Sequence, residues 1–319
     1  MRPDLDRAEP RRLLLLPLAL LLLSLAVIGH SFATGGGPLR LGLEFSGGTL
    51  VSLPTPETRE ALEARFAGYP LAGVREAGER KVLQFGPMDD RRLEGLASLL
   101  STGYPDAQVE QVGEVMGRAL QEQTAGLVAA SFLMMSLVVA VKFRKLIPAL
   151  TVIGSVGADL AAAVAFMRLA GVELSFGTLT ALVMLIGYGV DSNILLAVHL
   201  LRKRERWAEG PPPVRGKPPP PPPPEPEVAA KVGEARRTGL MMSGTTLAVL
   251  GVIFAVASYA LLAGFTQARI LADISLVLLA GISADLVNTW MLNAGLLRWH
   301  LERRPPEGQP PRRGRGVPP

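Results

Sequence analysis

The sequence predicts a polytopic α-helical membrane protein with six transmembrane helices and one small α+β domain outside the bilayer. Three observations support this fold class. Six apolar stretches are long enough to cross the hydrocarbon core, which takes about 20 helical residues. Hydrophobic residues make up 49% of the chain and charged residues 19%, below the roughly 25% usual for soluble domains. Segment 34–123 has instead the strand and helix patterns of a small folded domain.

The predicted spans are 13–33, 124–141, 146–167, 174–201, 239–263 and 270–297. The first also has features of a cleaved signal peptide, because Arg11-Arg12 precedes a leucine run and Ser31-Phe32-Ala33 follows it. We favour a retained span, because the apolar run is long for a signal peptide and five more spans follow.

The distribution of Lys and Arg predicts that both termini lie in the cytoplasm. Of the 33 basic residues, 22 fall in segments 1–12, 142–145, 202–238 and 298–319, whereas the two short loops on the other side hold only Arg168 and Arg269. The positive-inside rule makes the first set cytoplasmic. The chain is therefore expected to be a multi-pass protein of the cell (cytoplasmic) membrane. Its net charge of +5 is explained by topology and by contact with anionic membrane lipids, so no nucleic-acid partner is expected.

The pattern of the outer segment, 34–123, predicts the order strand, helix, strand, strand, helix, strand. The strands are expected at 49–53, 71–75, 81–85 and 107–112, and the helices at 57–67 and 89–100. This βαββαβ order is the ferredoxin-like arrangement. The segment contains no histidine and no Ser-His-Asp set, so no enzyme activity is expected. No GK[ST] follows Gly47-Gly48, which favours a tight turn over a phosphate-binding loop.

The cytoplasmic loop 202–238 contains 11 prolines within residues 210–226, which predicts a semi-rigid polyproline II spacer. A ligand for a proline-recognising domain is the alternative interpretation. The basic tail 298–319 is expected to be solvated. The chain has no cysteine and three histidines, so we expect no metal site and no cofactor.

Three aspartates fall at membrane depth on three different predicted spans: Asp159, Asp191 and Asp285. The helical rise places them about 20, 15 and 18 Å from the cytoplasmic ends of their helices. Ionisable residues at this depth are costly, and they face protein or water rather than lipid. We interpret the three as a carboxylate cluster near the midplane that exchanges protons. The alternative is that each aspartate is neutral and hydrogen-bonded, and holds helices together.

Residues near these aspartates complete the candidate site. Three polar neighbours are expected to support the carboxyl groups: Ser192, Asn193 and Asn288. Two glycines shortly before Asp191 are candidate hinges, because they should weaken the helix there: Gly187 and Gly189. Arg237, at the cytoplasmic start of the fifth span, is the candidate base that could reach inward to Asp191.

Several short motifs carry a family resemblance. Glu44-Phe45-Ser46-Gly47-Gly48-Thr49 is similar to a D-F-x-G-G-T signature, and Gly187-Tyr188-Gly189-Val190-Asp191-Ser192 to a G-Y-S-[LV]-[ND]-[DT] motif. Arg237-Thr238 followed by Ser243-Gly244-Thr245-Thr246 is similar to R-T…S-G-T-T. With one span, an outer domain and then five spans, the chain resembles the SecF family of protein-export membrane subunits. That family is part of the resistance-nodulation-division superfamily, and the stretch 191–196 is similar to its archaeal type.

The resemblance implies a function in protein export. It implies a SecD-like partner, association with the SecY-containing channel, and use of the proton gradient to help an exported polypeptide emerge. It also implies that Arg237 and one acid take part in proton flow, the acid being Asp191, with Asp159 as second candidate. The alternative is a small-molecule efflux transporter subunit of the same superfamily, although an outer domain of about 90 residues is small for that role.

Overall fold

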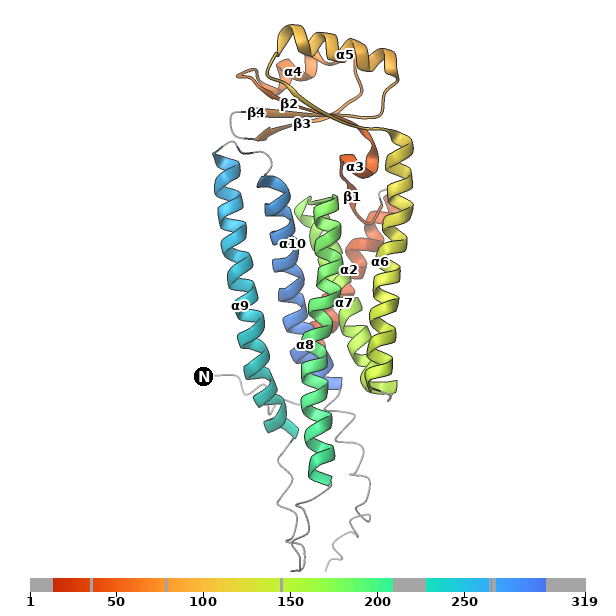
Figure 1. Cartoon of the computed structure of the whole chain (residues 1–319), viewed down its shortest axis with the longest axis vertical. Coiled ribbons are helices and arrows are strands. Elements are labelled where there is room, and N and C mark those ends of the chain that lie inside the picture. The colour runs from red at the N-terminus through yellow and green to blue at the C-terminus, as the bar shows by residue number, and fades with distance from the viewer. Residues whose placement is uncertain are drawn as a thin grey trace, which may run out of the picture.

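A computed structural model describes residues 14–34, 37–77, 80–143, 146–208, 228–263, 265 and 268–296. Figure 1 shows a bundle of long helices with a small sheet-containing domain on one end, which we call the domain end. Six of the described helices are long and apolar enough to cross a membrane, as the sequence predicted. They are α2 (Leu15–Ala33), α6 (Glu114–Phe143), α7 (Leu146–Ala170), α8 (Phe176–Ala208), α9 (Val228–Leu262) and α10 (Ala268–Val287), which continues as the π-helix η1 (Asn288–Asn293).

Several of these helices extend beyond the predicted spans. The apolar stretch 124–141 lies within α6, which begins at Glu114, and the stretch 239–263 lies within α9, which begins at Val228. Helix α8 begins at Phe176, and it runs past position 201 to Ala208. Hydropathy marks the part of a helix that contacts lipid, whereas the helix itself continues while its residues favour that conformation. Residues 1–13, the loop residues 209–227 and the tail 297–319 lie outside the described residues.

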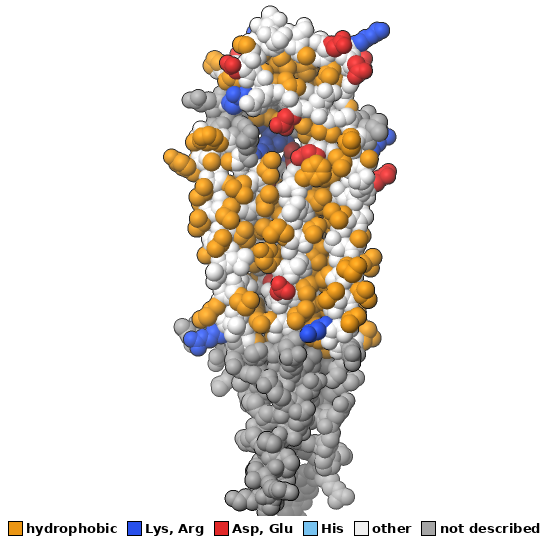
Figure 2. All heavy atoms as spheres, viewed as in Figure 1, with side chains coloured by type: hydrophobic (Ala, Val, Ile, Leu, Met, Phe, Trp, Pro, Cys, Tyr) orange, Lys and Arg blue, Asp and Glu red, His pale blue; other side chains and the backbone are white. Residues whose placement is uncertain are grey.

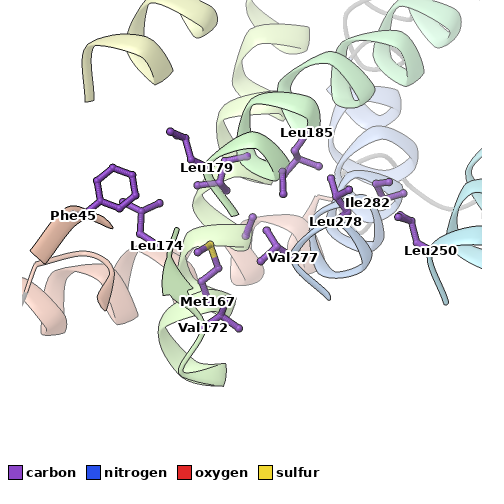
Figure 3. Packing of buried hydrophobic residues seen from close by; sticks show 13 residues of the cluster. Phe45, Met167, Val172, Leu174, Leu179, Leu185, Leu250, Val277, Leu278 and Ile282 are labelled. Atoms are coloured by element: carbon purple, nitrogen blue, oxygen red, sulfur yellow. The ribbon is translucent and has the colours of Figure 1, made fainter. Parts of the chain in front are cut away.

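Three helices form the interior of the bundle. About half of the span residues of α7, α8 and α10 are buried, whereas α2, α6 and α9 leave most of theirs exposed. Figure 2 accordingly shows many apolar side chains along the face of the bundle in view. Figure 3 shows the interior packing, with Leu185 of α8 beside Ile282 and Leu278 of α10. A Cβ atom at Gly281 would lie 2.6 Å from Leu185 Cδ2, so glycine is what lets α10 approach α8 closely here.

The small domain contains a four-stranded antiparallel sheet with the strand order β3-β4-β2-β5. Its elements follow the chain order β2 (Gly48–Pro54), α4 (Arg59–Arg65), β3 (Leu71–Ala77), β4 (Arg80–Phe85), α5 (Asp90–Gly103) and β5 (Gln108–Val112). Helices α4 and α5 lie on the side of the sheet that faces away from the bundle (Figure 1). The Thr58 hydroxyl begins α4 by accepting a hydrogen bond from the Ala61 amide.

The core of this domain lies between the sheet and its two helices. Val51 of β2 is opposite Leu83 of β4, and both are fully buried with Phe66 and Phe85. The aromatic rings of Phe66 and Phe85 meet edge to face, with centroids 5.6 Å apart. Apolar residues two positions apart thus point into one packed core, Val51 and Leu53 on β2 and Leu83 and Phe85 on β4.

The junction between domain and bundle is built on the motif at 44–49. The short helix α3 (Leu43–Ser46) places Phe45 in the bundle core, where its ring lies 5.5 Å from that of Phe176. Gln121 of α6 donates a hydrogen bond to the Phe45 carbonyl at 2.6 Å. Gly47 and Gly48 then turn the chain sharply into β2 with positive φ angles of 69° and 120°. The tight turn that the sequence favours at this glycine pair is therefore the joint between the two parts.

A second contact joins the same two parts. Strand β1 (Arg40–Leu41) pairs in parallel with β6 (Glu173–Leu174), the two-residue strand between α7 and α8. The Gly42 amide also donates a hydrogen bond to the Leu174 carbonyl at 2.8 Å. The linker that leaves α2 is thereby held against the bundle before it enters the domain.

Replacing Gly48 by alanine should destabilise the small domain. A Cβ atom there would lie 2.2 Å from the Phe85 carbonyl oxygen, and the φ angle disfavours any side chain. We expect Gly48→Ala to lower the free energy of unfolding by about 1–3 kcal/mol or more, measured as earlier thermal onset of protease cleavage within the domain. Gly103→Ala is the matched control, because nothing lies within 4 Å of a Cβ there. Equal onset temperatures for both variants would contradict this account of the joint.

Candidate functional site

Two of the three aspartates meet inside the bundle. Asp159 on α7 is 0% exposed and Asp285 on α10 is 2% exposed. Their carboxyl groups are close enough to interact electrostatically. Both flank Gly189 of α8, where a Cβ atom would lie 3.2 Å from Asp159 Oδ2 and 3.8 Å from Asp285 Oδ1. The missing side chain at position 189 is therefore what lets three helices converge on the acid pair.

Hydroxyl and amide groups at the start of η1 bind the two carboxylates. Asn288 Nδ2 donates a hydrogen bond to Asp159 Oδ1 at 2.6 Å, and Thr289 Oγ1 donates one to Asp285 Oδ1 at 2.8 Å. Both donors are buried, and they are the first two residues of the π-helix. A single π-helical turn in a longer helix is often found at a functional site.

A second pair of amides continues this network along the bundle. Asn293 Nδ2 donates a hydrogen bond to Asn193 Oδ1 at 2.6 Å, and Asn193 Nδ2 donates one to the Gly189 carbonyl at 2.6 Å. Asn193 and Asn293 are both 0% exposed. The network therefore runs from the acid pair through α8 to the end of η1.

Some buried oxygen atoms of the network have no partner among the described groups. They are Ser155 Oγ, Asp159 Oδ2, Asn288 Oδ1 and Asn293 Oδ1. An unpaired buried acceptor costs about 1–3 kcal/mol, so this network has the capacity to accept further protons or hydroxyl donors. Chemically, it can hold a proton on a carboxyl group that apolar helices otherwise surround.

Asp191, by contrast, is exposed and does not belong to the buried pair. It lines an apolar groove of about 580 Å³ between α6 and α8, with Met134 and Val138 on the other wall. It also lines a cavity of about 170 Å³ between α8, α9 and α10, together with Ser192 and Asp285. The exposed Asp191 and the buried Asp285 of the acid pair thus line one cavity.

The remaining predicted site residues are placed differently. Arg237 is exposed and, among the described residues, forms no ion pair with any of the three aspartates. Gly187 has nothing within 4 Å of a Cβ position and lines the groove beside Asp191. The two candidate hinge glycines lie inside the unbroken helix α8, where Gly189 serves close packing. Within the described part of the chain, no group of three or more His, Cys, Asp or Glu residues could hold a metal ion.

Sequence reasoning missed Asn293 altogether. In an α-helix with 3.6 residues per turn, positions five apart do not share a face. The π-helix has an i→i+5 hydrogen-bond pattern, and it brings Asn288 and Asn293 to the same side of the helix. The only sequence signal was two asparagines at an apolar helix end, which does not reveal a change in helical period.

Comparisons with known proteins agree on one family. The family model "Protein export membrane protein SecD/SecF, C-terminal" matches residues 97–211. Protein-export membrane protein SecF from Methanolacinia petrolearia is 37% identical over 300 residues, which are 94% of this chain and 97% of that protein. SecF from Haloferax volcanii is 33% identical over 93% of this chain and 94% of that protein.

Two solved structures are similar in fold. SecDF from Thermus thermophilus has a TM-score of 0.69 and 21% identity, and the match covers 90% of this chain but 37% of that chain. SecDF in a super-membrane-facing form has a TM-score of 0.52 and 21% identity, and covers 91% of this chain and 38% of that one. This chain therefore spans little more than a third of each SecDF chain.

Replacing Gly189 by alanine should disturb the acid pair, whereas the same change at Gly187 should not. The new methyl group at position 189 would meet Asp159 Oδ2 at 3.2 Å and Val156 Cγ2 at 3.4 Å. We expect Gly189→Ala to lower the free energy of unfolding by about 1–3 kcal/mol, as overpacking does, measured by thermal unfolding in detergent. Gly187→Ala should behave as the parent chain. A Gly189→Ala variant as stable as Gly187→Ala would show that α8 is not closely packed there.

Proposed function

The chain belongs to the SecF family of protein-export membrane proteins, and from this we propose that it forms one half of an export accessory whose other half is a SecD-like chain. The observation that carries the proposal is the match to SecDF, in which this whole bundle corresponds to little more than a third of one longer chain. The remainder of such an assembly has to come from a partner. We further propose that the outer domain is ferredoxin-like, which the strand order β3-β4-β2-β5 supports.

Asp191 supports the presence of a partner at the groove between α6 and α8. Ionisable groups at membrane depth are costly unless they face protein or water. Asp191 is exposed, and besides the cavity that it shares with Ser192 and Asp285 it borders a groove lined by Met134, Met135 and Val138. A second polytopic chain in this groove would enclose the carboxyl group and remove it from lipid. We propose this groove as the site of the SecD-like partner.

We propose that the acid pair couples export to an ion gradient, with the proton as the coupling ion. Asp159 and Asp285 lie on different helices, and each is hydrogen-bonded to η1 or the turn before it. Gain or loss of a proton would change the attraction between α7 and α10 at this point, and a change in helix position would follow. The cavity that Asp191, Ser192 and Asp285 line is a route by which protons could reach the pair.

The assembled complex would act with the SecY-containing channel on the exported polypeptide. The outer domain stands where a polypeptide would emerge if the basic ends of the helices are cytoplasmic. The alternative function, a small-molecule efflux subunit, shares the same bundle. The two functions differ in their partners and in what they move.

Co-purification tests the partner. Mild-detergent extraction of the tagged chain from its own cells should recover a second six-span chain and the SecY-containing channel. The Met134→Arg variant places a charged and bulkier side chain in the α6–α8 groove. A parallel preparation of this variant should not recover the six-span chain. Leu262→Arg is the matched control, because Leu262 is 82% exposed at the domain end of α9, away from the groove. Recovery of an efflux adaptor in place of the channel would favour the alternative function.

Removing the charge of the three aspartates tests proton coupling. Asp159→Asn, Asp285→Asn and Asp191→Asn should each assemble normally in proteoliposomes with the partner and channel. Each should remove most of the export that an imposed pH gradient stimulates, because an asparagine amide cannot gain or lose the proton that a carboxyl group carries. Glu94→Gln, on the exposed side of α5, is the control and should keep full stimulation. Full stimulation in all three aspartate variants would make the acid network purely structural.

A further inference from the structure

We propose that Arg75 and Glu173 form an electrostatic latch that holds the β3 edge of the outer domain down on the bundle. The two side chains form an ion pair between β3 of the domain and β6 of the bundle. This contact crosses the space between the sheet and the helix ends, where Figure 2 shows charged side chains beneath the domain. The inference concerns the position of the domain, and it does not depend on the proposed ion coupling.

Two other attachments of the domain lie toward the opposite edge of the sheet, whereas the pairing of β1 with β6 holds the incoming linker beside Glu173. The sheet order places β3 at one edge and β5 at the other, with β2 next to β5. Strand β5 leads through Gly113 directly into α6, and β2 follows the joint at Gly47 and Gly48. The buried Phe45 anchors this joint in the bundle core. The domain is therefore held firmly on one side, and Arg75 provides a contact on the other side.

The firm side has the geometry of a pivot. Nothing lies within 4 Å of a Cβ position at Gly113, so the single residue between β5 and α6 is not packed against either part. A small rotation at Gly113 and at the Gly47-Gly48 turn, with Phe45 kept in the bundle core, would lift the β3 edge without breaking the cores of the domain or the bundle. Glycine permits such rotation because it has access to a wide range of backbone angles.

The ion pair belongs to a cluster of alternating charges. Asp273 of α10 interacts electrostatically with both Glu173 and Arg75, and it forms an ion pair with Arg269 at 3.7 Å. If Arg75 left, Glu173 would face Asp273 with one fewer positive charge nearby. The cluster thus favours the closed position, and it ties the domain to α10, the helix that carries Asp285.

Both side chains of the Arg75–Glu173 ion pair are partly exposed, as expected for a contact that breaks and forms again. The side chain of Arg75 is 41% exposed and that of Glu173 is 19% exposed, so water and salt ions reach both. Partly exposed ion pairs are weak, whereas the burial of Phe45 on the other side is a permanent attachment. A contact of this strength changes the open population by a few fold and does not lock the domain.

Distance measurement between two spin labels tests the latch in the full-length chain. The chain has no cysteine, so Ala97→Cys on the exposed side of α5 and Leu169→Cys at the domain end of α7 give two unique labels. The labelled parent should show one dominant distance. Arg75→Gln and Glu173→Gln should each raise the population at longer distances about two- to fivefold, the range expected for a partly exposed ion pair.

Charge reversal separates a specific latch from a general loss of structure. The double variant Arg75→Glu with Glu173→Arg should restore the parent distribution, whereas either reversal alone should not. Arg59→Gln is the matched control, because it removes an exposed ion pair with Glu63 inside the domain. Single variants that keep the parent distribution, or a double variant that stays open, would overturn the proposal.

Ionic strength gives a test that needs no change to the latch residues. Raising salt from about 0.01 M to about 1 M shortens the Debye length from about 30 Å to about 3 Å. The longer-distance population of the labelled parent should rise over this range, and that of the Arg75→Gln variant should not. A parent distribution that does not change with salt would count against the latch.

Discussion

The burial of two carboxyl groups among apolar helices is the constraint on which the rest of the bundle depends. Charged or polar groups removed from water need partners from the protein itself, because lipid offers none. The chain meets this need for Asp159 with Asn288, and for Asp285 with Thr289. Glycine at position 189 lets the backbone of α8 reach the same point. Helices α7, α8 and α10 are the most buried spans because they are the ones that must enclose this site.

The sequence allowed the six helices and the order of the domain elements to be predicted, because both follow from local patterns. Apolar length identifies a span, and short apolar runs bounded by glycine or proline identify strands such as β2 and β4. The sequence did not show which of the three aspartates lie together. Asp191 and Asp285 have similar depths, but depth says nothing about rotation around a helix axis. The structure turns Asp285 inward and leaves Asp191 at the surface. The change of helical period at η1 is likewise invisible to a pattern that assumes 3.6 residues per turn.

The joint at 44–49 explains why a short motif matters in a chain of this kind. Phe45 belongs to the bundle core, whereas Thr49 already belongs to the sheet. Two glycines with positive φ make the change of direction within a few residues. Gln121 of α6 binds the same turn from the other side. The 44–49 motif is therefore part of both the domain and the bundle. A displacement of either part would be transmitted to the other through this joint.

The position of Asp191 follows from the same electrostatic constraint when the chain is taken as half of an assembly. The acid pair is satisfied by groups of this chain, so it can be buried here. Asp191 is exposed instead, on a groove that is mostly apolar, and Arg237 does not pair with it, although Ser192 and Asp285 line the cavity on its other side. An exposed acid on an apolar wall is unfavourable in lipid and favourable against a partner that supplies water or a base. Asp191 is therefore unfavourably placed in the single chain, and a second chain would provide its partners.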